Sequence, residues 1–158
     1  MTVLGIDPGL ERIGYGAVRT SGSRIEVVEH GLIKTPRVEI GLRLRSAHEQ
    51  AGEIFDRVRP DCVAVERLFF TKNRTSAMDV AKALGVVLLA ASQRGLECAE
   101  YSPSEVKLSV VGNGAADKAQ VAYMVVRLLG LAEPPRPDDV ADALAVALTH
   151  VLRAKVPR

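Results

Sequence analysis

Two short apolar runs, each ending in an acidic residue, constrain the fold of this chain more than any other feature. They are VLGID, which ends at Asp7, and CVAVE, which ends at Glu66. Apolar runs of this length are typical of central strands covered on both faces of a sheet. Pro8 favours an extended backbone at Asp7 and lacks the N–H that would continue a strand. We expect the two strands to be adjacent and parallel, so that both carboxylates emerge at one edge of the sheet, where open α/β folds place their sites.

The other segments predict the rest of an α/β fold. Short apolar runs between turn signals predict three antiparallel strands at the start of the chain, over residues 2–7, 13–20 and 23–35. Helical spacing of apolar residues predicts a crossover helix over Ile40–Val58, stopped by Pro60. A helix over 76–94, a last strand over 97–103 and three helices beginning at Ser104, Asp117 and Asp138 complete a five-stranded sheet with helices on both faces.

Length and composition favour one globular domain over residues 1–158. Apolar residues make up 47% of the chain and charged residues 25%, which is the balance of a globular protein and not of a disordered one. A net charge of +2 suits a nucleic-acid binder but also many other proteins. The N-terminus lacks a secretion signal, and the longest apolar stretch, 83–91, is about half of a bilayer crossing. We therefore expect a cytoplasmic protein without a membrane segment.

Two further features bear on metals and on assembly. Cys62 and Cys98 have no spacing that suits zinc, so we expect two reduced and mostly buried thiols. The helix around 83–91 is apolar nearly all round and must be buried either within this chain or against a second copy. The second copy is the slightly favoured alternative.

A third acidic group lies in PDDVADALAVALTHVL. Asp139 and Asp142 are three residues apart and share one side of a predicted helix, where two carboxylates repel each other unless a cation lies between them. An all-oxygen cluster of this kind suits Mg²⁺ or Mn²⁺. Single strand-end acids are commonly caps or ion-pair partners, and Asp138 after Pro137 could simply cap its helix. Several acids on independent elements favour a shared site that includes Asp7.

A basic and aromatic segment, RLFFTKNR, follows Glu66 at once. Phenylalanine beside cations suits bases that need a stacking surface and phosphates that need neutralising, although the two rings could instead cover the core. Successive side chains of a strand face opposite ways, so at least one ring is expected to be free for a ligand. The DNA-binding candidates in this segment are Arg67, Phe69, Phe70, Lys72, Asn73 and Arg74.

Two lysines on predicted helices complete the candidate site. Lys107 follows YSPSE, and Lys118 follows GNGAAD. Each reaches the acidic edge if its helix flanks that edge, whereas a lone helical lysine is usually just solvated.

Four segments, in this order and at these distances, closely resemble the RuvC family of Holliday junction resolvases, which has a ribonuclease H-like fold. They are GIDPG, VAVERLFFTKN, YSPSEVKLSVVGNGAADKAQV and DDVADALAVALTH. The resemblance covers nearly the whole chain, and four motifs in register are specific where GID alone would be weak. It implies a ribonuclease H-like mixed five-stranded sheet with helices on both faces.

The resemblance also implies a site. The catalytic acids would be Asp7, Glu66, Asp139 and Asp142, which would bind two Mg²⁺ ions per active site, with Mn²⁺ as a substitute. Asp139 is preferred to Asp138 because the family places this acid three residues before the one in DALA.

The activity that the resemblance implies is metal-dependent endonucleolytic cleavage of four-way (Holliday) DNA junctions in recombination and repair. Lys107 and Lys118 match basic residues near the scissile phosphate, and Phe69 matches an aromatic residue inserted against bases at the crossover. A homodimer would make paired symmetric nicks that leave 5′-phosphate and 3′-hydroxyl ends. A branch-migration helicase complex is a further partner that the family suggests.

Two alternatives stay open at this point. Actin-like ATPases also carry an Asp followed by Gly at their opening strand, but they generally need two such domains. A scaffold could hold branched DNA without cutting it, although four carboxylates near a DNA backbone repel phosphate unless metals neutralise them.

Overall fold

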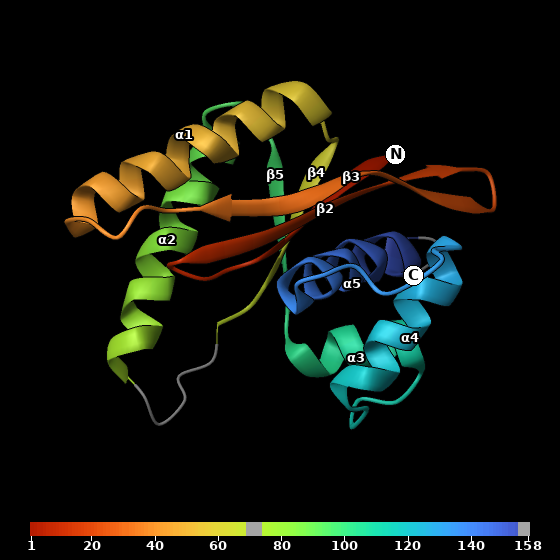
Figure 1. Cartoon of the computed structure of the whole chain (residues 1–158). Helices are drawn as coiled ribbons and strands as arrows, with labels where there is room; N and C mark the ends of the chain where they lie inside the picture. Colours follow the sequence, from red (N-terminus) through yellow and green to blue (C-terminus); the bar gives the residue numbers. More distant parts are fainter. Residues whose placement is uncertain (69–73, 155–158) are drawn as a thin grey trace.

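The five strands form one mixed sheet in the order β3-β2-β1-β4-β5 (Figure 1). The computed structural model describes residues 1–68 and 74–154, with side chains described for 1–68 and 77–154. Strands β1 (Thr2–Asp7), β2 (Arg12–Ser21) and β3 (Arg24–Lys34) pair antiparallel, while β4 (Cys62–Glu66) runs parallel to β1, and β5 (Glu97–Tyr101) runs parallel to β4. The predicted antiparallel start and the predicted parallel pairing of the two acid-ended strands are confirmed.

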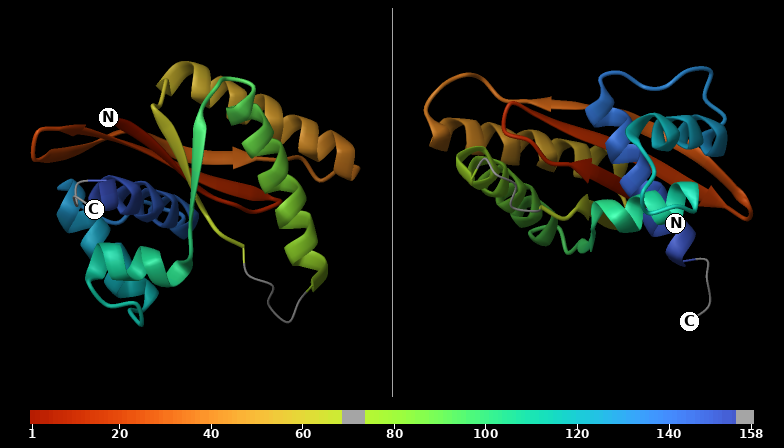
Figure 2. Two further views of the ribbon diagram at one scale, coloured as in Figure 1. Left: turned by 180° about the vertical axis from the view of Figure 1, so that it is seen from behind. Right: turned by 90° about the horizontal axis from the view of Figure 1, so that it is seen from below.

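Helices cover both faces of this sheet, as predicted (Figures 1 and 2). One layer holds α1 (Ile40–Val58) and α2 (Arg74–Ser92), and the other holds α3 (Pro103–Val111), α4 (Lys118–Leu129) and α5 (Asp138–Ala154). Side chains of β1 alternate between the layers: Leu4 and Ile6 pack with α1 and α2, and Val3 packs with α5. Because of this alternation, Asp7 lies on the α5 side of the sheet.

Two capping boxes fix where α3 and α4 begin. Ser102 accepts a hydrogen bond from the backbone N–H of Glu105, whose carboxylate accepts one from the Ser102 N–H in return. Asp117 and Gln120 make the same reciprocal arrangement at α4. The caps leave Lys118 as the first residue of α4, at the end of the helix that faces the strand ends.

Helix α2 differs from its prediction in position and in burial. It spans Arg74–Ser92 and not 76–94, because the chain turns after Ser92 and Gly95 adopts a positive φ of 70°. Val87 is buried against the core shared with α1, but Leu89 is 51% exposed. The helix is therefore only partly covered within this chain.

The expectation of two mostly buried cysteines is wrong for Cys98. Cys62 is half-buried on β4, whereas Cys98 is exposed. The physical reason is that β5 lies at the edge of the sheet, while β4 has neighbours on both sides. Among the described residues, no helix combines the length and hydropathy needed to span a membrane.

Candidate active site

The two strand-end acids meet at one edge of the sheet. In the parallel β1–β4 pair, Ile6 is opposite Val65, so Asp7 and Glu66 each follow a paired residue by one position. Ala64 belongs to the core on the α5 side, and alternation along β4 turns Glu66 to the same side as Asp7. The juxtaposition predicted from VLGID and CVAVE is therefore what the topology produces.

Helix α5 brings the remaining acids to this edge because glycines let it lie directly on the strands. A Cβ atom on Gly5 of β1 would collide with the Ala143 carbonyl oxygen, and one on Gly14 of β2 would collide with the Asp139 carbonyl oxygen. Neither strand position tolerates a larger residue without moving the helix. The close approach places the first two turns of α5 beside the ends of β1 and β2.

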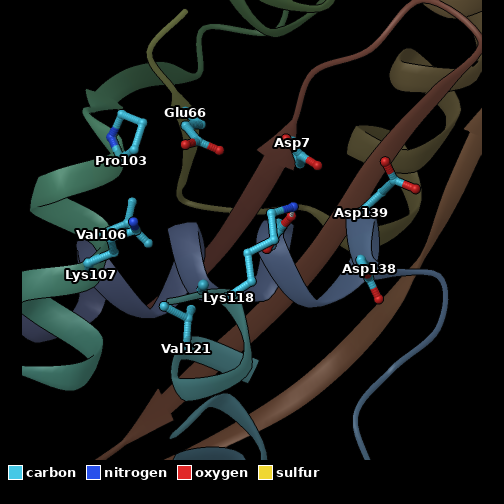
Figure 3. Close-up of a pocket in the computed structure, with 11 residues that line it drawn as sticks. Asp7, Glu66, Pro103, Val106, Lys107, Lys118, Val121, Asp138 and Asp139 are labelled. Carbon is cyan, nitrogen blue, oxygen red and sulfur yellow. Dashed lines mark hydrogen bonds and ion pairs between the residues drawn. The ribbon is translucent and has the colours of Figure 1, made fainter. Parts of the chain in front are cut away.

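Acids from β1, β4 and α5 line one cavity of about 340 Å³. Figure 3 shows Asp7, Glu66 and Asp139 around the same opening, with Lys118 extending toward them from α4. The full lining comprises Asp7, Glu66, Pro103, Val106, Lys107, Lys118, Val121, Asp138, Asp139, Asp142 and Ala145. All four acids and both lysines that were predicted from the sequence thus line a single pocket.

Cationic side chains contact both of the predicted α5 acids. The Lys118 ammonium lies 3.0 Å from a carboxylate oxygen of Asp142. An Arg12 guanidinium nitrogen at the start of β2 lies 3.2 Å from a carboxylate oxygen of Asp139. Lys107 acts at longer range, since its charge lowers the pKa of Glu66. The acidic pocket is therefore partly neutralised by cations from β2, α3 and α4.

Excess negative charge nevertheless dominates at Asp7. Burial, together with the Asp142, Glu66 and Asp139 carboxylates, raises the pKa of Asp7 to about 8 against the opposing effect of Lys118. Burial and Asp142 also raise the pKa of Glu66, against Lys118 and Lys107. A carboxylate with such a raised pKa ionises readily only when an additional cation enters the site.

The donor set fits a divalent metal ion of the oxygen-preferring kind. All the candidate ligands are carboxylates, which suit Mg²⁺ or Mn²⁺ and not Zn²⁺. Among residues 1–68 and 74–154, no three acids converge closely enough to enclose an ion, and the carboxylates of Asp139 and Asp142 contact Arg12 and Lys118 instead. An ion that joins Asp7 to α5 therefore competes with the positive charges of Arg12 and Lys118 for these carboxylates.

Asp138, the alternative to Asp139, lines the same cavity but holds a different position. It is the first residue of α5, and its negative charge adds to the effect of Asp142, whose hydrogen bond is the main reason for the raised pKa of Lys118. Acids in the first helical turn also interact favourably with the helix dipole. Asp139 differs from it in making the ion pair with Arg12.

The basic segment after β4 is described only at its two ends. Arg67 is exposed and lies 3.6 Å from Glu100 of β5, and its backbone N–H donates to the Tyr101 carbonyl. The predictions for Phe69, Phe70, Lys72 and Asn73, and for the side chain of Arg74, lie outside the described residues.

The sequence did not predict that Arg12 contacts an acid of the pocket, nor that apolar side chains form part of the pocket lining. Arg12 carried no local signal, because its partner Asp139 lies far along the chain and the contact depends on α5 crossing β2. Pro103, Val106 and Val121 look like ordinary helix residues in the sequence and acquire their position only when α3 and α4 pack beside α5.

A family model described as "Crossover junction endodeoxyribonuclease RuvC" matches residues 3–150. A curated protein of that name from Parafrankia sp. (strain EAN1pec) is 52% identical over 155 residues, which cover 97% of this chain and 87% of the relative.

Solved structures give the same result. The structure titled "T. thermophilus RuvC in complex with Holliday junction substrate" superposes with a TM-score of 0.93 at 41% identity, covering 98% of this chain and 95% of that one. The yeast mitochondrial Holliday junction resolvase superposes with a TM-score of 0.70 at 14% identity, covering 97% of this chain and 80% of that one, and shows the same fold.

Proposed function

Because the chain belongs to the RuvC family of crossover junction endodeoxyribonucleases, we propose that the acidic pocket at the ends of β1 and β4 is its active site. The protein is accordingly a nuclease that resolves four-way DNA junctions, and not an ATPase or a DNA scaffold without cleavage. The observation that carries the assignment of the site is the convergence of acids from β1, β4 and α5 with Lys107 and Lys118 around one cavity.

Asp7, Glu66, Asp139 and Asp142 are the residues we assign as metal ligands. The family is metal-dependent, and we propose two Mg²⁺ ions, replaceable by Mn²⁺, because the pocket offers four carboxylates and few cations to balance them. Bound divalent ions supply activation of the attacking water and stabilisation of the charge that develops on the phosphate and the leaving oxygen. Cleavage of this kind leaves 5′-phosphate and 3′-hydroxyl ends.

The chain's own residues prepare the pocket for a phosphate. Asp7 must release its proton to serve as a ligand, and its raised pKa means that this release accompanies metal entry. Lys107 and Lys118 lie on the opposite wall, from α3 and α4, where a DNA phosphate meets positive charge. Pro103, Val106 and Val121 limit the water on that wall, which strengthens the charge interactions inside.

Junction recognition and assembly complete the proposal. We assign residues 67–74 to contacts with the crossover, with Phe69 stacking on a base and the basic side chains meeting phosphates. We also propose that residues 1–158 form a single nuclease domain that acts as a homodimer in the cytoplasm, since a symmetric junction presents equivalent strands to two sites. A branch-migration helicase complex remains a proposed partner.

The test is cleavage of a labelled synthetic four-way junction beside a linear duplex of the same sequence, with Mg²⁺, with Mn²⁺ and with a chelator. We expect paired, ligatable nicks in the junction with either metal, none with the chelator, and a loss of about 10³-fold or more in Glu66→Gln. Glu97→Gln, an exposed acid at the other end of the parallel strands, is the matched control and should cut like the wild type. Equal activity of Glu66→Gln and wild type would remove the pocket as the active site.

A further inference from the structure

Arg12 makes an ion pair with a proposed metal ligand although it is itself half-exposed. Its guanidinium lies 3.2 Å from the Asp139 carboxylate, and the two side chains are 54% and 28% exposed. Arg12 begins β2, directly after the turn that follows Asp7, so the pair joins the strand beside the pocket to the first turn of α5. The contact is therefore built from two of the elements that form the site.

The surroundings of Arg12 explain why it needs an acidic partner. In the antiparallel β2–β3 pair, Arg12 stands opposite Lys34, and like charges directly across a ladder repel each other. Asp139 compensates this positive charge. When the Asp139 carboxylate is engaged elsewhere, Arg12 and the exposed Lys34 are two uncompensated positive charges side by side on β2 and β3.

A divalent ion on the Asp139 carboxylate repels the Arg12 guanidinium, which contacts one oxygen of the same group, so the ion pair is weaker when metal is bound. We propose that Arg12 is a positioning residue that couples metal binding to DNA binding. It holds the Asp139 side chain until a divalent ion takes over that carboxylate, and it is then available to contact a DNA phosphate beside the pocket. This inference rests on the proposed function of the site.

The coupling follows from reciprocity of binding. Weakening of the Arg12–Asp139 pair favours both metal at Asp139 and phosphate at Arg12, so whichever ligand binds first lowers this cost for the second. Half-exposed ion pairs are weak, and the corresponding factor is about two- to fivefold in each affinity. A coupling of this size changes the order in which metal and DNA bind, but it is too small to abolish cleavage.

The experiment compares wild type, Arg12→Gln, Arg12→Lys and Arg37→Gln. Arg37 is the matched control, because it pairs at 3.4 Å with Glu11 of the neighbouring turn and does not contact a pocket acid. Mn²⁺ affinity is measured without DNA by electron paramagnetic resonance. Junction affinity is measured by fluorescence anisotropy, once in chelator and once in Ca²⁺, with the junction recovered and checked for nicks.

We expect Arg12→Gln to bind Mn²⁺ about two- to fivefold more tightly than wild type and to lose a similar factor of the Ca²⁺-dependent gain in junction affinity. Arg12→Lys should restore both quantities toward wild type, and Arg37→Gln should leave both unchanged. Weaker Mn²⁺ binding by Arg12→Gln, or an unchanged gain with Ca²⁺, would overturn the coupling role. Loss of junction cleavage in Glu66→Gln, with cleavage retained in Arg12→Gln, would show that the proposed active site stands even if the coupling fails.

Discussion

Burial and three neighbouring carboxylates all raise the pKa of Asp7. The folded chain therefore binds a proton there far more tightly than an ordinary aspartate does. The pKa moves from 3.8 to about 8. Between these values the folded protein holds a proton that the unfolded chain releases, so the free energy of unfolding falls as pH rises through this window and levels off above about 8. A site arranged for metal ions thus opposes folding when no ion is supplied.

Replacing Asp7 by Asn removes this titration. In chelator, we expect Asp7→Asn to be more stable than wild type by about 1–3 kcal/mol at pH 8.5 and to show a smaller decrease between pH 5 and pH 8.5. Urea unfolding followed by circular dichroism over this range measures both effects. Glu53→Gln on the exposed side of α1 is the control and should follow the wild-type curve. If the free energies of unfolding of Asp7→Asn and wild type decrease equally between pH 5 and pH 8.5, burial and repulsion do not raise the pKa of Asp7 as we infer.

Single residues were predictable where their local context carried the signal. Asp7 and Glu66 stood out because an acid at the end of a buried strand is unusual, and their common edge followed from the parallel pairing. Arg12 could not be found in this way, since its role depends on an acid in α5. The exposure of Cys98 was missed because the residues of β5 do not reveal that this strand lies at the sheet edge.

Among the elements, α5 contributes the most residues to the proposed site. The strands that it packs on have glycines at the points of closest approach. Gly5 and Gly14 leave no side chain between the sheet and the backbone of α5, so the helix carries its acids to the ends of β1 and β2. The sequence predicted this helix and its acids from periodicity. It did not predict the close approach, because a glycine within a strand can equally mark a bulge or a tight bend.

Gly14→Ala should therefore impair catalysis more than stability. The added methyl group meets the Asp139 carbonyl, and moving the start of α5 by about 1 Å displaces Asp139, which costs on the order of 100-fold in cleavage rate. We expect a decrease of about 1–3 kcal/mol in the free energy of unfolding. Junction cleavage under single-turnover conditions and urea unfolding measure the two effects.

The matched control is Gly114→Ala in the loop before α4, where an added methyl group meets only the Ser104 carbonyl oxygen at an ordinary contact distance of 3.6 Å. This variant should cut normally and gain about 0.4–1 kcal/mol in stability, because alanine restricts the unfolded chain more than glycine does. A Gly14→Ala enzyme that cuts at the wild-type rate would show that α5 can shift without disturbing its acids.

For the whole molecule, the uneven covering of α2 points to the surface that a second copy would use. Met78 and Leu89 are 58% and 51% exposed on this helix, although its other side is buried against α1 and the sheet. Apolar side chains exposed along one helix are a common feature of homodimer contacts. The helix also begins at Arg74, the last residue of the segment 67–74 that we assign to the crossover.

We predict that Leu89→Glu weakens the proposed homodimer by tenfold or more, because a charge would be buried in the contact. Sedimentation velocity measures the dimer, and a junction in a cruciform plasmid distinguishes single from paired nicks. Leu108→Glu is the control, since Leu108 is 57% exposed on α3 in the opposite layer. Unchanged sedimentation of Leu89→Glu, or equal weakening by Leu108→Glu, would place the contact elsewhere.

The order in which the acids occur along the chain has a consequence for biosynthesis. Asp7 and Glu66 belong to strands made early, whereas Asp139 and Asp142 belong to α5, the last helix. A ribosome-bound chain that has completed the sheet therefore lacks half of its proposed metal ligands, as well as the helix that covers one face. The proposed site is therefore incomplete until α5 has been made and has docked on the sheet.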